Sequence, residues 1–241
     1  MRNVGIIVRR ELAGYFRTPS GYLIAAATLL VQGLMFNTRA LGTGQKLSSQ
    51  VLQDFLRDSS GTTTVAAVLL AMRLFAEERQ SGTIVLLYTS PVREAQIVIG
   101  KFLSAFVVLS IITLLSLYLP ALIFVHGKVS LGHIAGGYAG LLCVGAATLS
   151  LGVLGSALAR TQLVAGVIAA VLIFVLFLTW QLSRVVEPPL GTVLAHLSLY
   201  EKHFFPFMRG LIQLSDVVYY AGVVYLALLA ATRVVQHQRW Q

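Results

Sequence analysis

Six long apolar segments, separated by polar stretches, dominate the pattern of this chain. Each approaches the roughly 20 residues that a helix needs to cross the hydrocarbon core of a bilayer. The pattern predicts an all-α membrane protein with six transmembrane helices, and an even number of spans puts both termini on one side. The expected spans are 21–36, 61–75, 97–125, 131–158, 163–182 and 217–235.

The first 19 residues are predicted to form an amphipathic helix lying along the membrane surface. Pro19 ends this helix before the chain turns into the first span. A secretory signal peptide is disfavoured, because no small-residue cleavage site follows the apolar run and five more spans come after it. The expected apolar face is Val4, Ile7, Val8, Leu12, Tyr15 and Phe16, and the polar side is Arg9, Arg10, Glu11 and Arg17.

Two polar loops are expected on the outer side. Residues 37–60 form a polar excursion with a short helix over 47–56. Residues 184–216 form a longer loop with apolar pieces at 190–199 and 204–214. Pieces that short cannot span a bilayer, so we expect re-entrant or interfacial helices buried against protein.

Composition supports one membrane domain over 1–241. Of the 241 residues, 57 % are hydrophobic and 11 % are charged, whereas soluble domains carry about 25 % charged residues. The net charge of +9 is dispersed rather than gathered in a patch, which argues against nucleic-acid binding. With the N-terminus inside, eleven basic residues fall in inner segments and seven in outer ones, which predicts cytoplasmic termini. The single cysteine, Cys143, excludes an intramolecular disulfide.

Motifs for catalysis or metal binding are absent from the sequence. Gly100-Lys101 opens no phosphate-binding loop, and the five histidines are scattered, although His126 and His133 are close enough in sequence to meet near the outer surface as metal ligands. Arg73 and Asp216 fall at span ends and are expected to reach the headgroups. Without a central buried charge, a proton- or sodium-coupled transporter is disfavoured. We therefore expect a non-catalytic chain that binds no metal or cofactor itself.

The fourth expected span is rich in small residues, which let helix backbones approach closely. They serve either static packing within the subunit or a sliding or dimer-forming surface. The positions assigned to helix packing are Gly136, Gly140, Gly152 and Ser156.

The long polar interruption over 77–101 separates the second and third spans. Gly82 permits a turn that most residues resist, and Thr83 is expected to cap a short helix that Pro91 ends. Such a helix, parallel to the membrane, suits docking into a groove on a partner, and a plain surface hairpin is the alternative. The proposed interface residues are Glu77, Glu78, Arg79, Gly82, Thr83, Leu86, Leu87, Pro91 and Arg93.

Three stretches resemble the ABC-2-type exporter permeases. EERQSGTIVLLYTSPV is similar to their E-x-x-x-G-T-x-E-x-L-L-x-x-P-V/I signature, except that Val85 replaces the usual acidic residue. RELAGYFRTPSGYL resembles the family's N-terminal elbow helix. FFPFMRGLIQLSDVVYY is similar to the gliding-motility-type branch, which is related to the nitrous-oxide-reductase maturation permeases.

The resemblance implies a transmembrane subunit of an ABC transporter in the inner membrane of a prokaryote. It implies a dimer of such subunits, identical or related, with two copies of a separate ATPase that binds ATP and Mg²⁺. Residues 77–95 would be the cytoplasmic coupling segment, and charge reversal at Glu78 or Arg93 would uncouple the ATPase without unfolding the chain. One alternative is a mechanotransmission subunit acting on periplasmic partners, which needs an added external subunit. Another is an ATP-independent channel or secondary transporter.

Overall fold

Helices make up nearly all of the chain in the computed structural model, which describes residues 2–40, 47–83, 92–126, 129–187 and 189–239; these residues contain no β-strand. The helices are α1 (Arg2–Arg17), α2 (Pro19–Ala40), α3 (Ser48–Ala71), α4 (Ala76–Gln80), α6 (Glu94–Leu115), α7 (Tyr118–His126), α8 (Leu131–Leu158), α9 (Gln162–Ser183), α10 (Leu190–Leu197), α11 (Phe205–Met208) and α12 (Leu214–Arg239).

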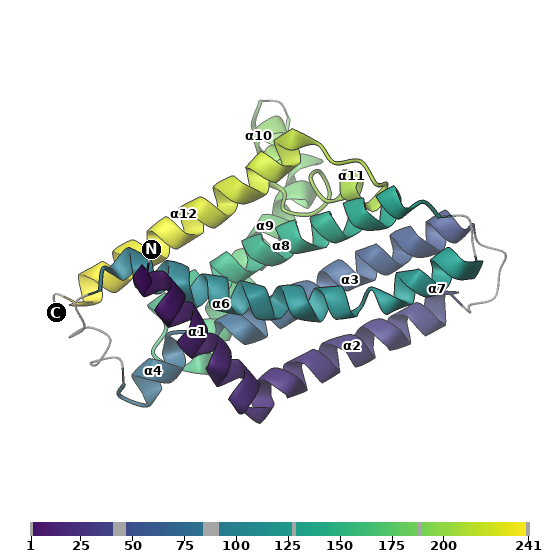
Figure 1. The fold of residues 1–241 in the computed structure, drawn as a ribbon. Coiled ribbons are helices and arrows are strands. Elements are labelled where there is room, and N and C mark those ends of the chain that lie inside the picture. The colour runs from purple at the N-terminus through teal and green to yellow at the C-terminus, as the bar shows by residue number, and fades with distance from the viewer. Residues whose placement is uncertain (1, 41–46, 84–91, 127–128, 188, 240–241) are drawn as a thin grey trace.

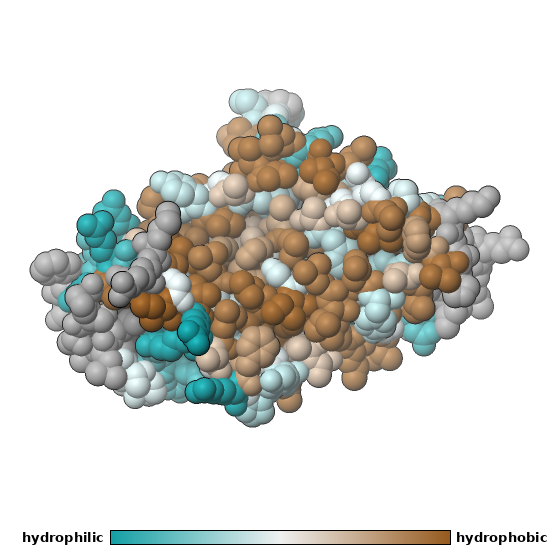
Figure 2. Space-filling view, viewed as in Figure 1, coloured by the Kyte–Doolittle hydropathy of each residue, from teal (hydrophilic) through white to brown (hydrophobic). Residues whose placement is uncertain are grey.

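The six predicted spans are confirmed as six helical stretches long and apolar enough to cross a bilayer among the described residues. They are α2, α3 with α4, α6 with α7, α8, α9 and α12. Both termini and α4 lie at one end of the bundle, called the terminal end below, and α7 lies at the opposite, distal end (Figure 1). On the face shown in Figure 2, apolar residues cover the middle of the bundle, as expected of a lipid-exposed surface.

Two loop predictions are wrong in detail. The helix expected over 47–56 is continuous with the second span, because α3 runs unbroken from Ser48 to Ala71. Its polar residues fit inside the bundle because hydroxyls such as that of Ser60 donate to carbonyls of the same helix. The helix expected over 204–214 is only the four residues of α11, since the chain turns at Gly210 with φ of 77°.

Helix α8 is the centre of the bundle. In its most apolar stretch 72 % of the residues are buried, against 11 % for α2 and for α9. Glycines allow this close packing: a Cβ on Gly152 would lie 2.4 Å from Cβ of Ala71, and one on Gly140 would lie 2.5 Å from Cβ of Phe207. Gly136 abuts Gly210 in the same way. All these contacts are within the subunit, so the buried small residues are not exposed to a second copy.

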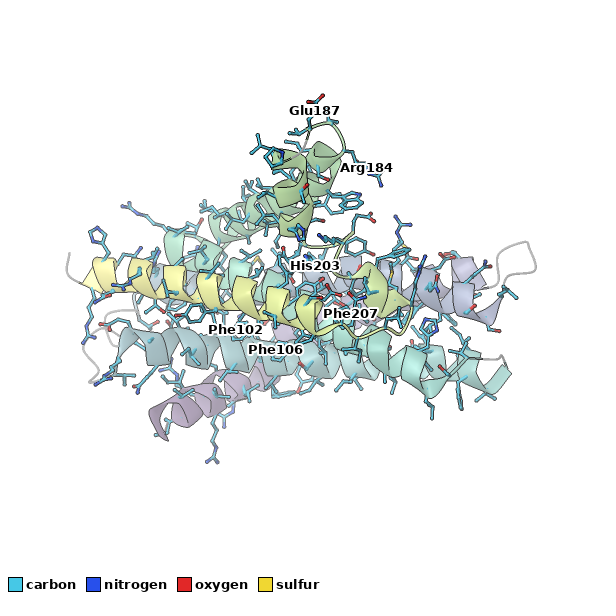
Figure 3. All side chains as sticks on the ribbon, turned by 90° about the horizontal axis from the view of Figure 1, so that it is seen from above. Phe102, Phe106, Arg184, Glu187, His203 and Phe207 are labelled. Carbon is cyan, nitrogen blue, oxygen red and sulfur yellow. The ribbon has the colours of Figure 1, made fainter. Side chains whose placement is uncertain are left out.

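Two apolar cores fill the bundle. The core toward the terminal end joins α1, α3, α6, α8 and α12, and Phe75 and Leu109 are among its buried side chains. The core toward the distal end joins α3, α7, α8, α11 and α12 around Leu56, Leu141 and Phe207. Helix α9 splays outward and carries α10 with it (Figures 1 and 3), so the tip holding Arg184 and Glu187 projects away from the bundle.

Candidate functional site

A charged cluster of four side chains joins α1, α4 and α6 at the terminal end. Its centre is Lys101, whose side chain is only 1 % exposed. The Lys101 Nζ lies 3.1 Å from Oε1 of Glu11 and 2.9 Å from Oε1 of Glu78. Nη2 of Arg10 lies 3.0 Å from the same oxygen of Glu11 and 3.1 Å from that of Glu78. In the charged cluster, each of the two basic side chains therefore pairs with both carboxylates.

Close packing of α1 on α6 brings these groups together. Ile7 lies against Gly100, where a Cβ would come within 2.8 Å of the isoleucine Cγ2, so a larger residue at position 100 would push α1 away. One turn along α1 from Ile7, Glu11 then meets Lys101, the residue after Gly100. One further turn along, the buried Tyr15 hydroxyl donates to the carbonyl of Leu70 at 3.2 Å and fixes α1 to α3.

The ionisation of Glu11 follows from its neighbours. Burial raises the pKa of this carboxyl, but the attraction of Lys101 and the hydrogen bonds from Arg10 and Lys101 outweigh burial and lower it. The hydrogen bond to Glu11 raises the pKa of Arg10. The charged cluster therefore favours the charged forms of Glu11 and Arg10. A buried ion network of this kind contributes little net stability, but it fixes which helices meet.

A second set of contacts ties α4 to the central helix α8. The Ser156 hydroxyl accepts from the backbone N–H groups of Phe75 and Ala76 at 3.0 and 3.2 Å. Arg79 donates to the carbonyl of Ala157 at 2.6 Å, and it also bonds the carbonyl of Ala159 and the amide of Gln238 on α12. The guanidinium of Arg79, expected to contact a partner, is therefore engaged inside the subunit.

Other predicted interface residues remain on the surface. Glu77 is 46 % exposed and pairs with Arg73, four residues earlier, at 2.8 Å. Gly82 has φ of 72°, the left-handed conformation that the sequence predicted for a turn, and Thr83 is exposed beside it. Arg93 is exposed immediately before α6. The expected helix and its residues Leu86, Leu87 and Pro91, with Val85, lie outside the described residues.

The predicted N-terminal helix is present as α1, and α2 begins at Pro19. Three residues of its assigned apolar face contact the bundle: Ile7 and Leu12 pack against the apolar core at the terminal end, and Tyr15 is part of it. The side chain of Phe16 points outward from the bundle and is 51 % exposed. Adjacent residues on a helix point about 100° apart, so Tyr15 and Phe16 cannot both face α6.

Lys101 was missed by the sequence interpretation. The sequence feature that could have identified it is a lone lysine four residues into the apolar run that begins at Ile97. An ionisable side chain in such a run needs a partner. The partners are 90 and 23 positions away, and no local pattern connects them.

A buried polar pair at the start of α12 was also missed. Asp216 was expected to reach the headgroups, but it is buried and its Oδ1 lies 2.8 Å from Nδ1 of His203. His203 is buried beside the start of α12 (Figure 3), with its ring stacked 3.9 Å from that of Tyr219. Its Nε2 lies 3.1 Å from the carbonyl of His196, which can only accept, so Nε2 carries a hydrogen.

The remaining described side chains offer no alternative chemical centre. Among them, no three His, Cys, Asp or Glu residues gather closely enough to hold a metal ion. A cavity of about 270 Å³ lies between α1 and α4 beside the charged cluster, lined by Arg73, Glu77 and Thr83 among others.

Comparison with known families agrees with this architecture. Residues 27–208 match the family model described as ABC-2 family transporter protein. No curated protein shows significant similarity to the chain. The match covers most of the chain, with four of its six spans complete and a fifth in part, and the chain belongs to the ABC-2 transporter family of multi-pass membrane proteins.

Proposed function

We propose that this chain is the permease subunit of an ABC transporter, driven by ATP hydrolysis in a separate ATPase. The observation that carries the proposal is the charged cluster, because it joins the segment around α4 to α1 and α6 in one place. Family membership supplies the ATPase as the class of partner. ATP and Mg²⁺ would be bound by that partner, and this chain would catalyse no step.

The ATPase would dock on the coupling segment 77–95, which includes the exposed side chains of Glu77 and Arg93. Its movement would reach α6 and α1 through Glu78, the shared partner of Lys101 and Arg10. It would reach α8 through Ser156. Packed helices shift as rigid bodies, so a displacement of α4 would move several spans together. ATP can drive this shift only if the two conformations bind the ATPase differently.

The setting of the permease is part of the proposal. The terminal end would face the cytoplasm of a prokaryote, in the inner membrane, with two permease subunits and two ATPases. The excess of basic residues at that end supports the orientation. The lightly buried helices α2 and α9 leave apolar surface for lipid and for the second subunit. The similarity of residues 204–220 supports the gliding-motility-type branch.

Purification of the tagged chain from its native membranes tests the proposal. We expect an ABC ATPase to co-elute at one copy per permease, with ATP hydrolysis that vanadate inhibits. Arg93→Glu should abolish co-elution while the variant elutes as the folded wild type does, and Arg184→Glu on the projecting tip of α9 is the matched control. A folded wild-type chain that elutes with no ATPase would sink the proposal.

A further inference from the structure

Helix α1 lies against the side of the bundle, at a level between the two ends of the spans. It crosses α6 near the terminal end and then meets the start of α2 (Figure 1). Ile7 and Glu11 contact Gly100 and Lys101, which come six and seven residues after the first residue of α6. At 1.5 Å per residue this is about 10 Å from the helix end. A helix at that depth on the side of a membrane bundle lies at the level of the lipid headgroups.

The outward surface of α1 is basic. We call it the arginine face, and its residues are Ile6, Arg9, Arg10, Ala13, Gly14 and Arg17. Glu11 is the acidic residue of α1; it turns inward to Lys101 and pairs with Arg10, but not with Arg9 or Arg17. Arg9 and Arg17 are exposed and form no ion pair with any acid in the part of the chain that the structure describes. In Figure 2 hydrophilic residues follow this helix beside the apolar middle of the bundle.

Small and apolar residues complete the shape of this surface. Ala13 and Gly14 separate the two groups of arginines, and a Cβ on Gly14 would meet nothing within 4 Å. The arginine face therefore encloses a shallow hollow of about 550 Å³. Ile6, on this face, is 61 % exposed, and Phe16, roughly a quarter turn around α1 from Ile6, is 51 % exposed, although a purely aqueous surface would gain nothing from them.

We propose that the arginine face binds the phosphate of an anionic phospholipid headgroup. A guanidinium can donate two parallel hydrogen bonds to phosphate oxygens. Arg9 and Arg17 lie on either side of the hollow, and neither guanidinium is paired with an acid among the described residues. Ile6 and Phe16 reach the boundary between headgroups and acyl chains. Tyr22, 59 % exposed at the start of α2, adds an interfacial aromatic that donates to the carbonyl of Phe16.

The occupant is a lipid rather than a protein because this basic surface is continuous with the lipid-exposed start of α2 and lies at headgroup depth. The inference rests on the six spans and on the packing of α1 against α6. It does not depend on the ATPase, so it stands or fails separately from the proposed function.

Native mass spectrometry of the detergent-purified chain tests this site. Phosphatidylglycerol and phosphatidylcholine are titrated in turn, and wild type is compared with Arg9→Gln/Arg17→Gln. Each arginine near a charged lipid surface contributes about fivefold in affinity, so the double variant should bind phosphatidylglycerol roughly thirtyfold more weakly. Arg9→Lys/Arg17→Lys should lose less, and Arg184→Gln/Arg209→Gln, which removes the same charge at other sites, should leave that affinity unchanged.

Three results would overturn the lipid site. One is equal binding of the two lipids by wild type, and another is unchanged phosphatidylglycerol binding by Arg9→Gln/Arg17→Gln. The third is loss of ATPase co-elution or of self-association in that variant without a change in lipid binding, which would assign the arginine face to a protein partner. The circular dichroism spectrum of each variant shows that the fold is retained.

Discussion

The ammonium of Lys101 lies 2.9 Å from the carboxylate of Glu78, which joins the third membrane span to the short helix that ends the second. Only 1 % of the lysine side chain is exposed, and Glu11 is its second carboxylate partner. Glu78 is therefore a structural partner of a buried charge as well as part of the predicted interface. Reversing its charge would place a third cation beside Lys101 and Arg10, so we expect this change to lower the free energy of unfolding as well as to affect coupling.

We predict a measurable energetic coupling between these two residues. Lys101→Met leaves the carboxylates of Glu11 and Glu78 without their buried cation and should lower the free energy of unfolding by about 3 kcal/mol. In a double-mutant cycle with Glu78→Gln, unfolding by SDS titration in mixed micelles should give a coupling energy of about 1–3 kcal/mol. Purely additive effects would show that the two groups do not interact.

Acidification should loosen α1 through Glu11. The pKa of Glu11 is lowered in the folded chain, so its stabilising contribution is complete above the ordinary value of 4.5 and is lost as the pH falls below it. Between about pH 6 and about pH 3, wild type should lose more thermal stability than Glu11→Gln, which has no carboxyl to titrate at this position. The difference between the two slopes isolates Glu11 from the other carboxyls, and equal slopes would argue against the lowered pKa.

The buried pair of His203 and Asp216 should act as a unit. Asp216→Leu removes the partner of the His203 Nδ1 and should cost about 1–3 kcal/mol. His203→Phe keeps a ring against Tyr219 but leaves a carboxylate buried without its partner, which should cost more, about 3–5 kcal/mol. The double variant should lose less than the sum of the two, because no unpaired polar group remains. Losses that add in full would contradict the pairing.

Close packing of α8 on α3 predicts a steric effect at Gly152. Gly152→Ala would put a Cβ 2.4 Å from the Cβ of Ala71, which has no flexible end that could move aside. The expected loss is about 1–3 kcal/mol, measured by unfolding in mixed micelles. Gly222→Ala on α12 is the matched control, because a Cβ there meets nothing within 4 Å and should be neutral or stabilising. A Gly152→Ala variant as stable as wild type would refute the close approach.

The bounds of the fourth span could be predicted from the sequence alone. Its predicted bounds, 131–158, are those of α8, because a continuous apolar run begins after Ser130, whose hydroxyl accepts from the backbone N–H of His133 and caps the helix. The second span shows where sequence does not suffice. Polar residues such as Ser59 and Ser60 led to a predicted start at 61, yet both are buried in the bundle as part of α3.

The site was only partly predictable for the same reason. The polar interruption after the second span and the turn at Gly82 are local features of the sequence. Both lie at the terminal end, where the charged cluster is. The pairing of Lys101 with Glu11 depends on α1 lying against α6, a contact between positions 90 residues apart. The hydrogen bonds that Arg79 makes within the subunit likewise depend on where the ends of α8 and α12 lie. A single sequence carries no signal for such contacts.

Photo-crosslinking in native membranes tests most directly the claim that an ATPase docks at the terminal end. Arg93 is replaced by p-benzoylphenylalanine in one variant and Arg184, on the projecting tip of α9, in another, and both are illuminated with and without ATP. We predict that the chain substituted at position 93 crosslinks to an ABC ATPase, with a yield that changes with ATP, and that the chain substituted at 184 does not. An ATPase crosslinked from position 184 and absent at position 93 would contradict the account.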